Sequence, residues 1–135
     1  MSLSFDDVEL GDDLPETHPD VSLERVRQFV KAADMDFPRF TDDAAARAEG
    51  LPGALVPGIM SQGLLAVMIH EWAPGSCVRK LDTVFRFPVL VGTRPRCSGA
   101  VTDTDEETRT VTIDLTLTSE TGETSLMGTA VVELD

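Results

Sequence analysis

Basic residues are scarce in this sequence. Its 135 residues include 11 lysines and arginines against 24 aspartates and glutamates, which gives a formal net charge of −13. Lysine occurs only as Lys31 and Lys80. A surface this acidic repels phosphate backbones and anionic lipid headgroups. The composition therefore argues against nucleic acid and against a membrane surface as partners.

Cysteine and histidine are also scarce. Cys77 and Cys97 both fall in strand-like segments, and His18 and His70 lie far apart in the chain. A structural zinc site usually needs four ligands, so we expect no metal. The sequence does not open with a signal-peptide pattern, which favours the reducing cytoplasm and argues against a disulfide. Repeats, low-complexity tracts and linkers are missing as well, so residues 1–135 are expected to form one domain.

The longest apolar stretch, LVPGIMSQGLLAVMIHEW at residues 55–72, is too short to span a membrane. A Pro-Gly turn at residues 57–58 opens it, and Pro74 and Gly75 close it. Its length and composition predict a helix over residues 58–72. Because this helix is apolar nearly all round, we expect it to be buried on nearly all sides.

The segment before this helix predicts two shorter helices separated by an acidic loop. Ser22 is a suitable N-cap for a helix over residues 23–33, with apolar residues at helical spacing. Residues 33–43 read as a loop, because proline at position 38 disfavours helix just before it. A short alanine-rich helix then begins after Thr41 or Asp42 and ends at Gly50.

After residue 75 the apolar period changes to two, which predicts strands. We place them near residues 78–87, 94–104, 108–118 and 125–134, the last three joined by tight turns into an antiparallel meander. Such a sheet has one dry face that needs a cover. The sequence therefore predicts an α+β fold in which a curved antiparallel sheet wraps around the helix at 58–72. An edge strand of such a sheet favours a homodimer.

Four pieces of the sequence together resemble the hot-dog fold of the MaoC-like acyl dehydratases and R-specific enoyl-CoA hydratases. They are the acidic loop before the alanine-rich helix, PGIMSQGLLAVMIHEW at 57–72, the Ala-Pro-Gly turn at 73–75, and FRFPVLVGT at 85–93. The resemblance extends over residues 21–134. It implies a lyase of fatty acid metabolism that adds water to a 2-enoyl thioester or removes it from a 3-hydroxyacyl thioester, carried by coenzyme A or acyl carrier protein. No further cofactor is implied.

In that family an aspartate and a histidine of the acidic loop activate the water, and a backbone amide at the start of the buried helix polarises the thioester carbonyl. The resemblance assigns the acid/base role to Asp34 or Asp36 and the amide to Gly58. It also marks a departure, since Phe40 stands where the family has its catalytic histidine and Pro57 replaces the histidine of the usual His-Gly pair.

Two alternatives to a self-sufficient hydratase therefore remain open. The chain could be a non-catalytic, acyl-thioester-binding subunit that pairs with a catalytic homologue. A hot-dog thioesterase is the lesser alternative, because the helix carries no carboxylate between residues 58 and 70.

The remaining candidates line the expected acyl site. Phe40, Pro57 and Met60 would flank an apolar tunnel, and Ser61, one turn after the start of the helix, would bond the thioester or simply allow close packing. The chain's one basic concentration would bind the phosphates of coenzyme A or merely face water; it comprises Arg79, Lys80 and Arg86.

Overall fold

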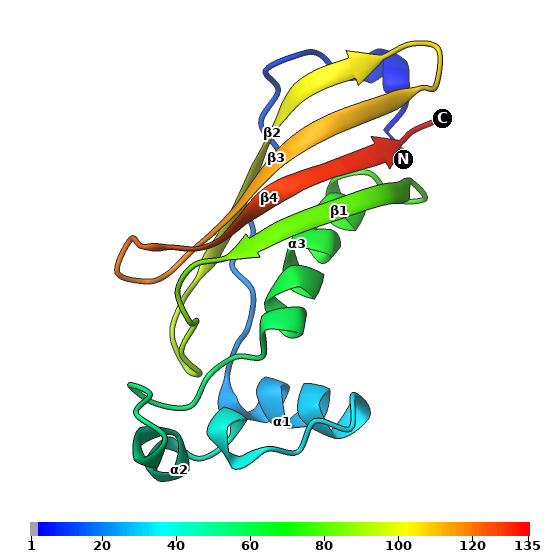
Figure 1. The fold of residues 1–135 in the computed structure, drawn as a ribbon. Helices are drawn as coiled ribbons and strands as arrows, with labels where there is room; N and C mark the ends of the chain where they lie inside the picture. The colour runs from blue at the N-terminus through cyan, green and yellow to red at the C-terminus, as the bar shows by residue number, and fades with distance from the viewer. Residues whose placement is uncertain (1–2) are drawn as a thin grey trace.

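The computed structural model describes residues 3–135 and contains one four-stranded antiparallel sheet with a long helix across one face (Figure 1). The strand order is β1-β4-β3-β2. Strands β2, β3 and β4 form the expected meander, and β1 adds to the outer side of β4. The strand bounds are β1 Cys77–Phe85, β2 Arg96–Asp105, β3 Thr110–Thr118 and β4 Thr124–Glu133.

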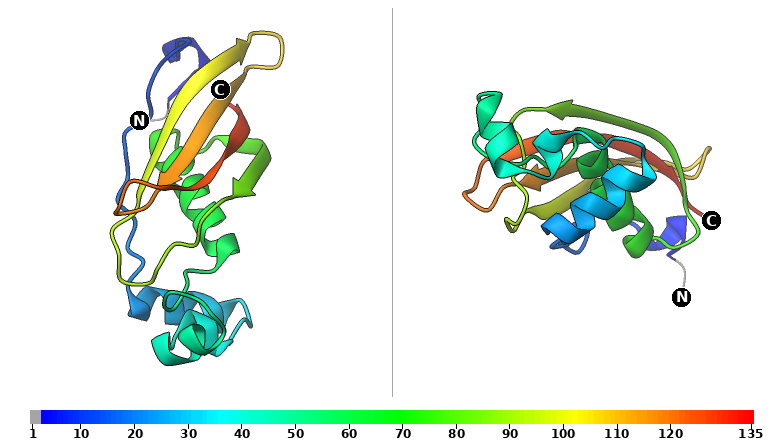
Figure 2. Two further views of the ribbon diagram at one scale, coloured as in Figure 1. Left: turned by 60° about the vertical axis from the view of Figure 1, so that its left-hand side comes forward. Right: turned by 90° about the horizontal axis from the view of Figure 1, so that it is seen from below.

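The helices also follow the sequence prediction. Helix α1 spans Leu23–Ala32, α2 spans Asp43–Ala48 and α3 spans Gly58–Trp72, with a short 3-10 turn, η2, at Pro38–Phe40. Helices α1 and α2 lie together beyond the N-terminal end of α3, away from most of the sheet (Figures 1 and 2). The chain thus brings its acidic loop and short helix to the end of α3 where that helix begins.

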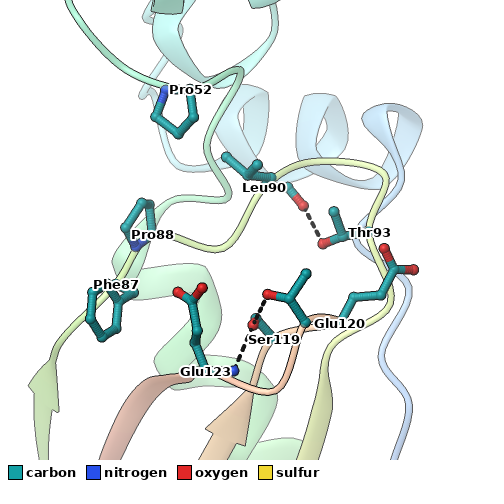
Figure 3. A pocket seen from close by; sticks show the side chains of 9 residues that line it. Pro52, Phe87, Pro88, Leu90, Thr93, Ser119, Glu120 and Glu123 are labelled. Atoms are coloured by element: carbon teal, nitrogen blue, oxygen red, sulfur yellow. Dashed lines mark hydrogen bonds between the residues drawn. The ribbon is translucent and has the colours of Figure 1, made fainter.

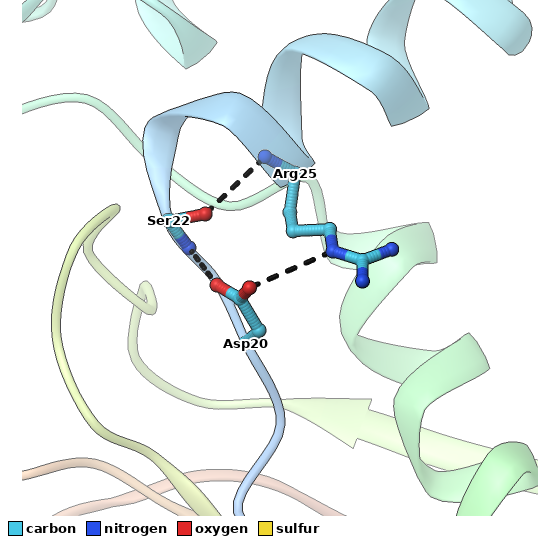
Figure 4. Close-up of polar contacts among 3 residues, drawn as sticks. All are labelled: Asp20, Ser22 and Arg25. Atoms are coloured by element: carbon cyan, nitrogen blue, oxygen red, sulfur yellow. Dashed lines mark hydrogen bonds and ion pairs between the residues drawn. The ribbon is translucent and has the colours of Figure 1, made fainter.

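Side-chain caps explain where α1 and α2 start. The Ser22 hydroxyl accepts a hydrogen bond from the Arg25 amide at 3.3 Å, and the Asp20 carboxylate accepts one from the Ser22 amide at 2.9 Å (Figure 4). Of the two candidates for capping α2, Asp42 performs this role, since its carboxylate accepts from the amides of Ala44 and Ala45. These caps satisfy amides that otherwise lack a partner at a helix start.

Helix α3 is buried on one side only, so the expectation of burial on nearly all sides is wrong. Leu65, Met68 and Ile69 are buried against the sheet, whereas Ile59 is 58% exposed and Val67 is 51% exposed. A single sheet can contact only one face of a helix. Nothing else in the described chain covers the opposite face fully, although the sequence makes that face equally apolar.

A shared carbonyl and a proline make the connection between β1 and β2 longer than the sequence predicts, because β1 ends before residue 87 and β2 begins after residue 94. Strand β1 stops at Phe85, because the next two amides both donate to the carbonyl of Ser125 on β4. Strand β2 begins at Arg96 because Pro95 has no amide to donate. The N-terminal segment forms bridges to β2 at Asp13 and Thr17, which leaves β1 as the open edge of the sheet.

Candidate functional site

A pocket of about 300 Å³ lies where α3 begins. Its walls come from η2, the segment before α3 together with the first turn of that helix, the end of β1 with the segment that follows, and the start of β4. They include Phe40, Gly58, Ser61, Phe85, Arg86 and Ser125. This volume is at the small end of the range for pockets that bind organic ligands.

The start of α3 presents backbone amides that no side chain caps. Its N-cap is Pro57, which makes no side-chain capping bond. The first amides of a helix lack intrahelical partners and sit at the positive end of the helix dipole. Gly58, the first helical residue, lines the pocket. The geometry therefore offers a site for an oxygen that carries, or develops, negative charge.

Two buried serines line the same pocket from opposite elements. Ser61 on α3 is 3% exposed and Ser125 on β4 is 1% exposed, and they are the only buried polar residues among residues 3–135. The prediction that Gly58 and Ser61 share one side of the helix is consistent with their common pocket. Ser125 was not predicted, because nothing in the sequence of β4 distinguishes it from the other small polar residues of the strands.

The pocket contains hydrogen-bond donors but lacks an acid/base pair. Arg86 is the one ionisable side chain among its lining residues. The lining includes no histidine, aspartate or glutamate. Such a site can bind and polarise a carbonyl group, but its own side chains cannot exchange a proton with a substrate carbon near neutral pH.

The two aspartates assigned to acid/base catalysis lie outside this pocket. Asp34 and Asp36 are both exposed on the loop after α1, and neither lines the pocket. Asp34 has a φ of 55°, and the amide of Met35 donates to the carbonyl of Val30 at 2.7 Å. These are the features of a residue that ends a helix in the left-handed conformation. The structure thus gives Asp34 a local structural role.

The predicted tunnel residues separate into two groups. Phe40 and Ser61 line the pocket. Pro57, the residue before Gly58, is buried but does not line it. Met60 instead lines a different groove, between α1 and α3, together with Phe29 and other side chains. Consecutive residues of a helix point about 100° apart, and Met60 and Ser61 accordingly line different cavities.

The three predicted phosphate-binding residues differ in their surroundings. Arg79 forms an ion pair with Glu133, and the Lys80 ammonium lies 3.3 Å from the Asp82 carboxylate. Arg86 makes no ion pair with any of residues 3–135 and lines the pocket. It is therefore the one member of the set placed to meet a ligand in the pocket.

A second cavity of about 370 Å³ adjoins the first, and Phe87 and Pro88 line both (Figure 3). The turn between β3 and β4 forms its other side. There the Ser119 hydroxyl accepts a hydrogen bond from the Glu123 amide at 3.1 Å. Glu120 and Glu123 supply carboxylates, but both are exposed. The second cavity therefore enlarges the space next to the pocket but adds no buried carboxylate.

Metal binding, reactive-thiol chemistry and membrane spanning find little support in the residues that the structure describes. Within residues 3–135, no cluster of three or more histidines, cysteines or acids is arranged to hold a metal ion. Burial raises the pKa of Cys97 to about 11, which keeps its thiol protonated and unreactive. Over the same residues, no helix has the length and apolarity needed to cross a membrane.

Comparison with known proteins identifies the fold. No family model matches this chain, and no curated protein sequence matches it either. Solved structures match it over nearly its whole length. The (R)-hydratase from A. caviae involved in PHA biosynthesis is 22% identical, with 95% of this chain and 98% of that chain covered and a TM-score of 0.89.

Two further structures extend the comparison. A MaoC-like dehydratase is 26% identical with a TM-score of 0.91; the match covers 99% of this chain but 43% of that longer chain. A chain of the ChsH1–ChsH2 complex from Mycobacterium tuberculosis is 17% identical, with 95% of this chain and 99% of that chain covered and a TM-score of 0.86. The protein has the hot-dog fold, and its predicted resemblance to MaoC-like dehydratases and (R)-hydratases is confirmed.

Proposed function

We propose that the protein binds an acyl thioester in the pocket at the start of α3, with the thioester carbonyl oxygen at the Gly58 amide. The uncapped first turn of α3, open to a small and mostly apolar pocket, is the observation that carries this proposal. An amide at a helix N-terminus stabilises the negative charge that a thioester oxygen acquires when the neighbouring carbon gains or loses a proton.

Coenzyme A is the carrier that the charge distribution favours. The protein is acidic overall, so a polyanionic carrier needs local cations. Arg86 lines the pocket and is not neutralised by an ion pair within residues 3–135. We propose that its guanidinium meets a phosphate of coenzyme A at the pocket entrance.

We further propose that the chain acts as a binding subunit of a hydratase or dehydratase, with the acid/base groups supplied by a homologous partner chain. Hydration adds a hydroxyl to C3 and a proton to C2, and the pocket lining has no imidazole or carboxylate to transfer that proton. Three exposed apolar side chains beside the pocket are available to a partner: Ile59, which follows Gly58, and Phe85 and Phe87, which line the pocket. The structure of the ChsH1–ChsH2 complex, in which a chain of this fold occurs, supports such an arrangement.

The test is to compare binding with turnover for the chain on its own. Calorimetric titration with 2-butenoyl-CoA should show binding, whereas the absorbance of the conjugated thioester should remain constant over hours at neutral pH. Arg86→Gln should weaken the binding of the CoA thioester but not that of a pantetheine thioester, which lacks the nucleotide phosphates. Absence of binding would exclude the thioester proposal, and rapid hydration would exclude the need for a partner.

A stand-alone hydratase that uses an aspartate is the second candidate, because η2 places Phe40 in the pocket wall only a few residues after Asp36. Asp36→Ala and Asp34→Gly separate the two functions. For a binding subunit, both variants retain thioester affinity, and Asp34→Gly raises the free energy of unfolding by about 1 kcal/mol because glycine tolerates the left-handed conformation. Hydration by the wild type that disappears in either variant would establish the second candidate.

A further inference from the structure

The buried hydroxyl of Ser125 is not explained by packing within the described chain. Its hydroxyl is buried and has no hydrogen-bond partner among residues 3–135. A buried hydroxyl without a partner destabilises the fold by about 1–3 kcal/mol, and alanine at the same position would avoid this. The residue nevertheless lies in the wall of the pocket at the start of α3.

The backbone around Ser125 holds its side chain at this place. The β3–β4 pairing shifts register here: Leu117 pairs with Leu126 and Thr118 with Thr124, so that Ser125 is the extra residue of a bulge. A bulge turns a side chain away from the regular alternation of a strand, and bulges are frequent beside binding sites. The carbonyl of Ser125 also accepts the amides of Arg86 and Phe87, at 2.9 and 3.2 Å. Both of these residues line the same pocket.

We infer that Ser125 is a specificity-determining residue of this pocket, whose hydroxyl donates a hydrogen bond to an oxygen of the bound acyl group. The inference rests on the proposed acyl-thioester function and assigns a role within that site. Because hydrogen bonds anchor the backbone at Ser125, its hydroxyl is limited to the three staggered positions about the Cα–Cβ bond, and the inference requires the one that faces the cavity. A pocket with such a donor favours acyl groups that bear an oxygen and disfavours alkyl groups that leave it unpaired.

Two oxygens of a 3-hydroxyacyl thioester could accept this bond: the thioester carbonyl and the 3-hydroxyl. Three CoA ligands with the same four-carbon chain distinguish them. S-Butyl-CoA, a thioether, has neither oxygen; butyryl-CoA has the carbonyl; 3-hydroxybutyryl-CoA has both. If Ser125 contacts the carbonyl, Ser125→Ala should weaken the binding of butyryl-CoA and of 3-hydroxybutyryl-CoA. If it contacts the 3-hydroxyl, only 3-hydroxybutyryl-CoA should bind more weakly.

Ser76→Ala is a matched control. Ser76 is the other residue of 3–135 whose buried hydroxyl has no partner, and it does not line the pocket. Both substitutions remove an orphaned hydroxyl and are expected to leave the fold at least as stable. Only Ser125→Ala is expected to change ligand binding.

The experiment is calorimetric titration of the full chain, as wild type, Ser125→Ala and Ser76→Ala, with each of the three ligands. We expect Ser125→Ala to lose about tenfold in affinity for the ligand with the contacted oxygen and to bind S-butyl-CoA at least as well as wild type. Equal effects on all three ligands, no effect on any, or the same effect from Ser76→Ala would overturn the role of Ser125. If wild type binds none of the ligands, the proposed function fails and this inference fails with it.

Discussion

Replacing Gly58 with alanine should weaken thioester binding while leaving the fold nearly as stable. A Cβ atom on Gly58 would lie 3.0, 3.3 and 3.4 Å from the Cε1, Cδ1 and Cζ atoms of Phe85. Ordinary contacts between carbon atoms are about 3.5–4.0 Å, so the ring must move by about 0.5 Å. Because the ring is 57% exposed, it can move without disturbing the core.

The expected stability change is small because two contributions oppose each other. Alanine is favoured over glycine in a helix by about 0.5–1 kcal/mol, and displacing an exposed ring offsets part of that gain. We therefore expect the free energy of unfolding to change by less than about 1 kcal/mol. Thioester affinity should fall by about tenfold or more, since the displaced ring forms part of the pocket wall and small errors in position weaken binding strongly.

A double-mutant cycle tests this reasoning. The Phe85→Ala substitution removes the three ring atoms that would lie 3.0–3.4 Å from the new methyl group. In that background, Gly58→Ala should have no further effect on affinity, whereas in the wild-type background it should have its full effect. Thioester affinity is measured by calorimetry and stability by urea unfolding for all four proteins. An unchanged affinity in Gly58→Ala, or a loss of equal size in both backgrounds, would refute the proposed mechanism.

Two further predictions concern the fold. Gly128→Ala should destabilise the protein by about 3 kcal/mol or more, as measured by urea unfolding. The reason is that the new Cβ would lie 2.0 Å from the Asp82 carbonyl oxygen of the paired strand. A stability close to that of the wild type would show that β1 and β4 can separate there. The pKa of Asp20 lies below its ordinary value of 3.8, chiefly because the Ser22 amide donates to it. The stabilisation it provides is therefore present above about pH 4 and is lost as the pH falls through the lowered pKa. Asp20→Asn should make α1 less sensitive to acid below pH 4 by circular dichroism, and an unchanged acid response would contradict this account.

The sequence predicts the elements of this fold well, because their ends depend on local chemistry. Proline and glycine at positions 57 and 58 fix the start of α3, and the carboxylate of Asp42 fixes the start of α2. The left-handed residue Gly50 ends α2 as expected. Each of these signals lies within a few residues of the boundary it determines.

Features that depend on tertiary contacts could not be predicted in the same way. Because α3 is apolar on all sides, its sequence does not indicate which row of residues the sheet covers, and Val67 proved to be exposed. The position of Ser125 depends on a register shift between two strands, which leaves no local pattern. Asp34 seemed chemically suitable for catalysis, but its left-handed conformation at the end of α1 is visible only in the structure.

The proposed partner chain would explain both the exposed face of α3 and the lack of an acid/base group in the pocket lining. Ile59, which begins the exposed face, directly follows Gly58, whose amide we place at the thioester oxygen. Phe85 and Phe87 line the pocket and are themselves half-exposed, so the pocket wall is continuous with the uncovered apolar surface. A chain bound to this surface and to the open edge of β1 would bring its own side chains to the pocket entrance. Burial of the aromatic rings would also exclude water from the pocket, which strengthens the hydrogen bonds to the thioester oxygen. One association would thus cover the apolar face, close the pocket and supply the group that transfers the proton.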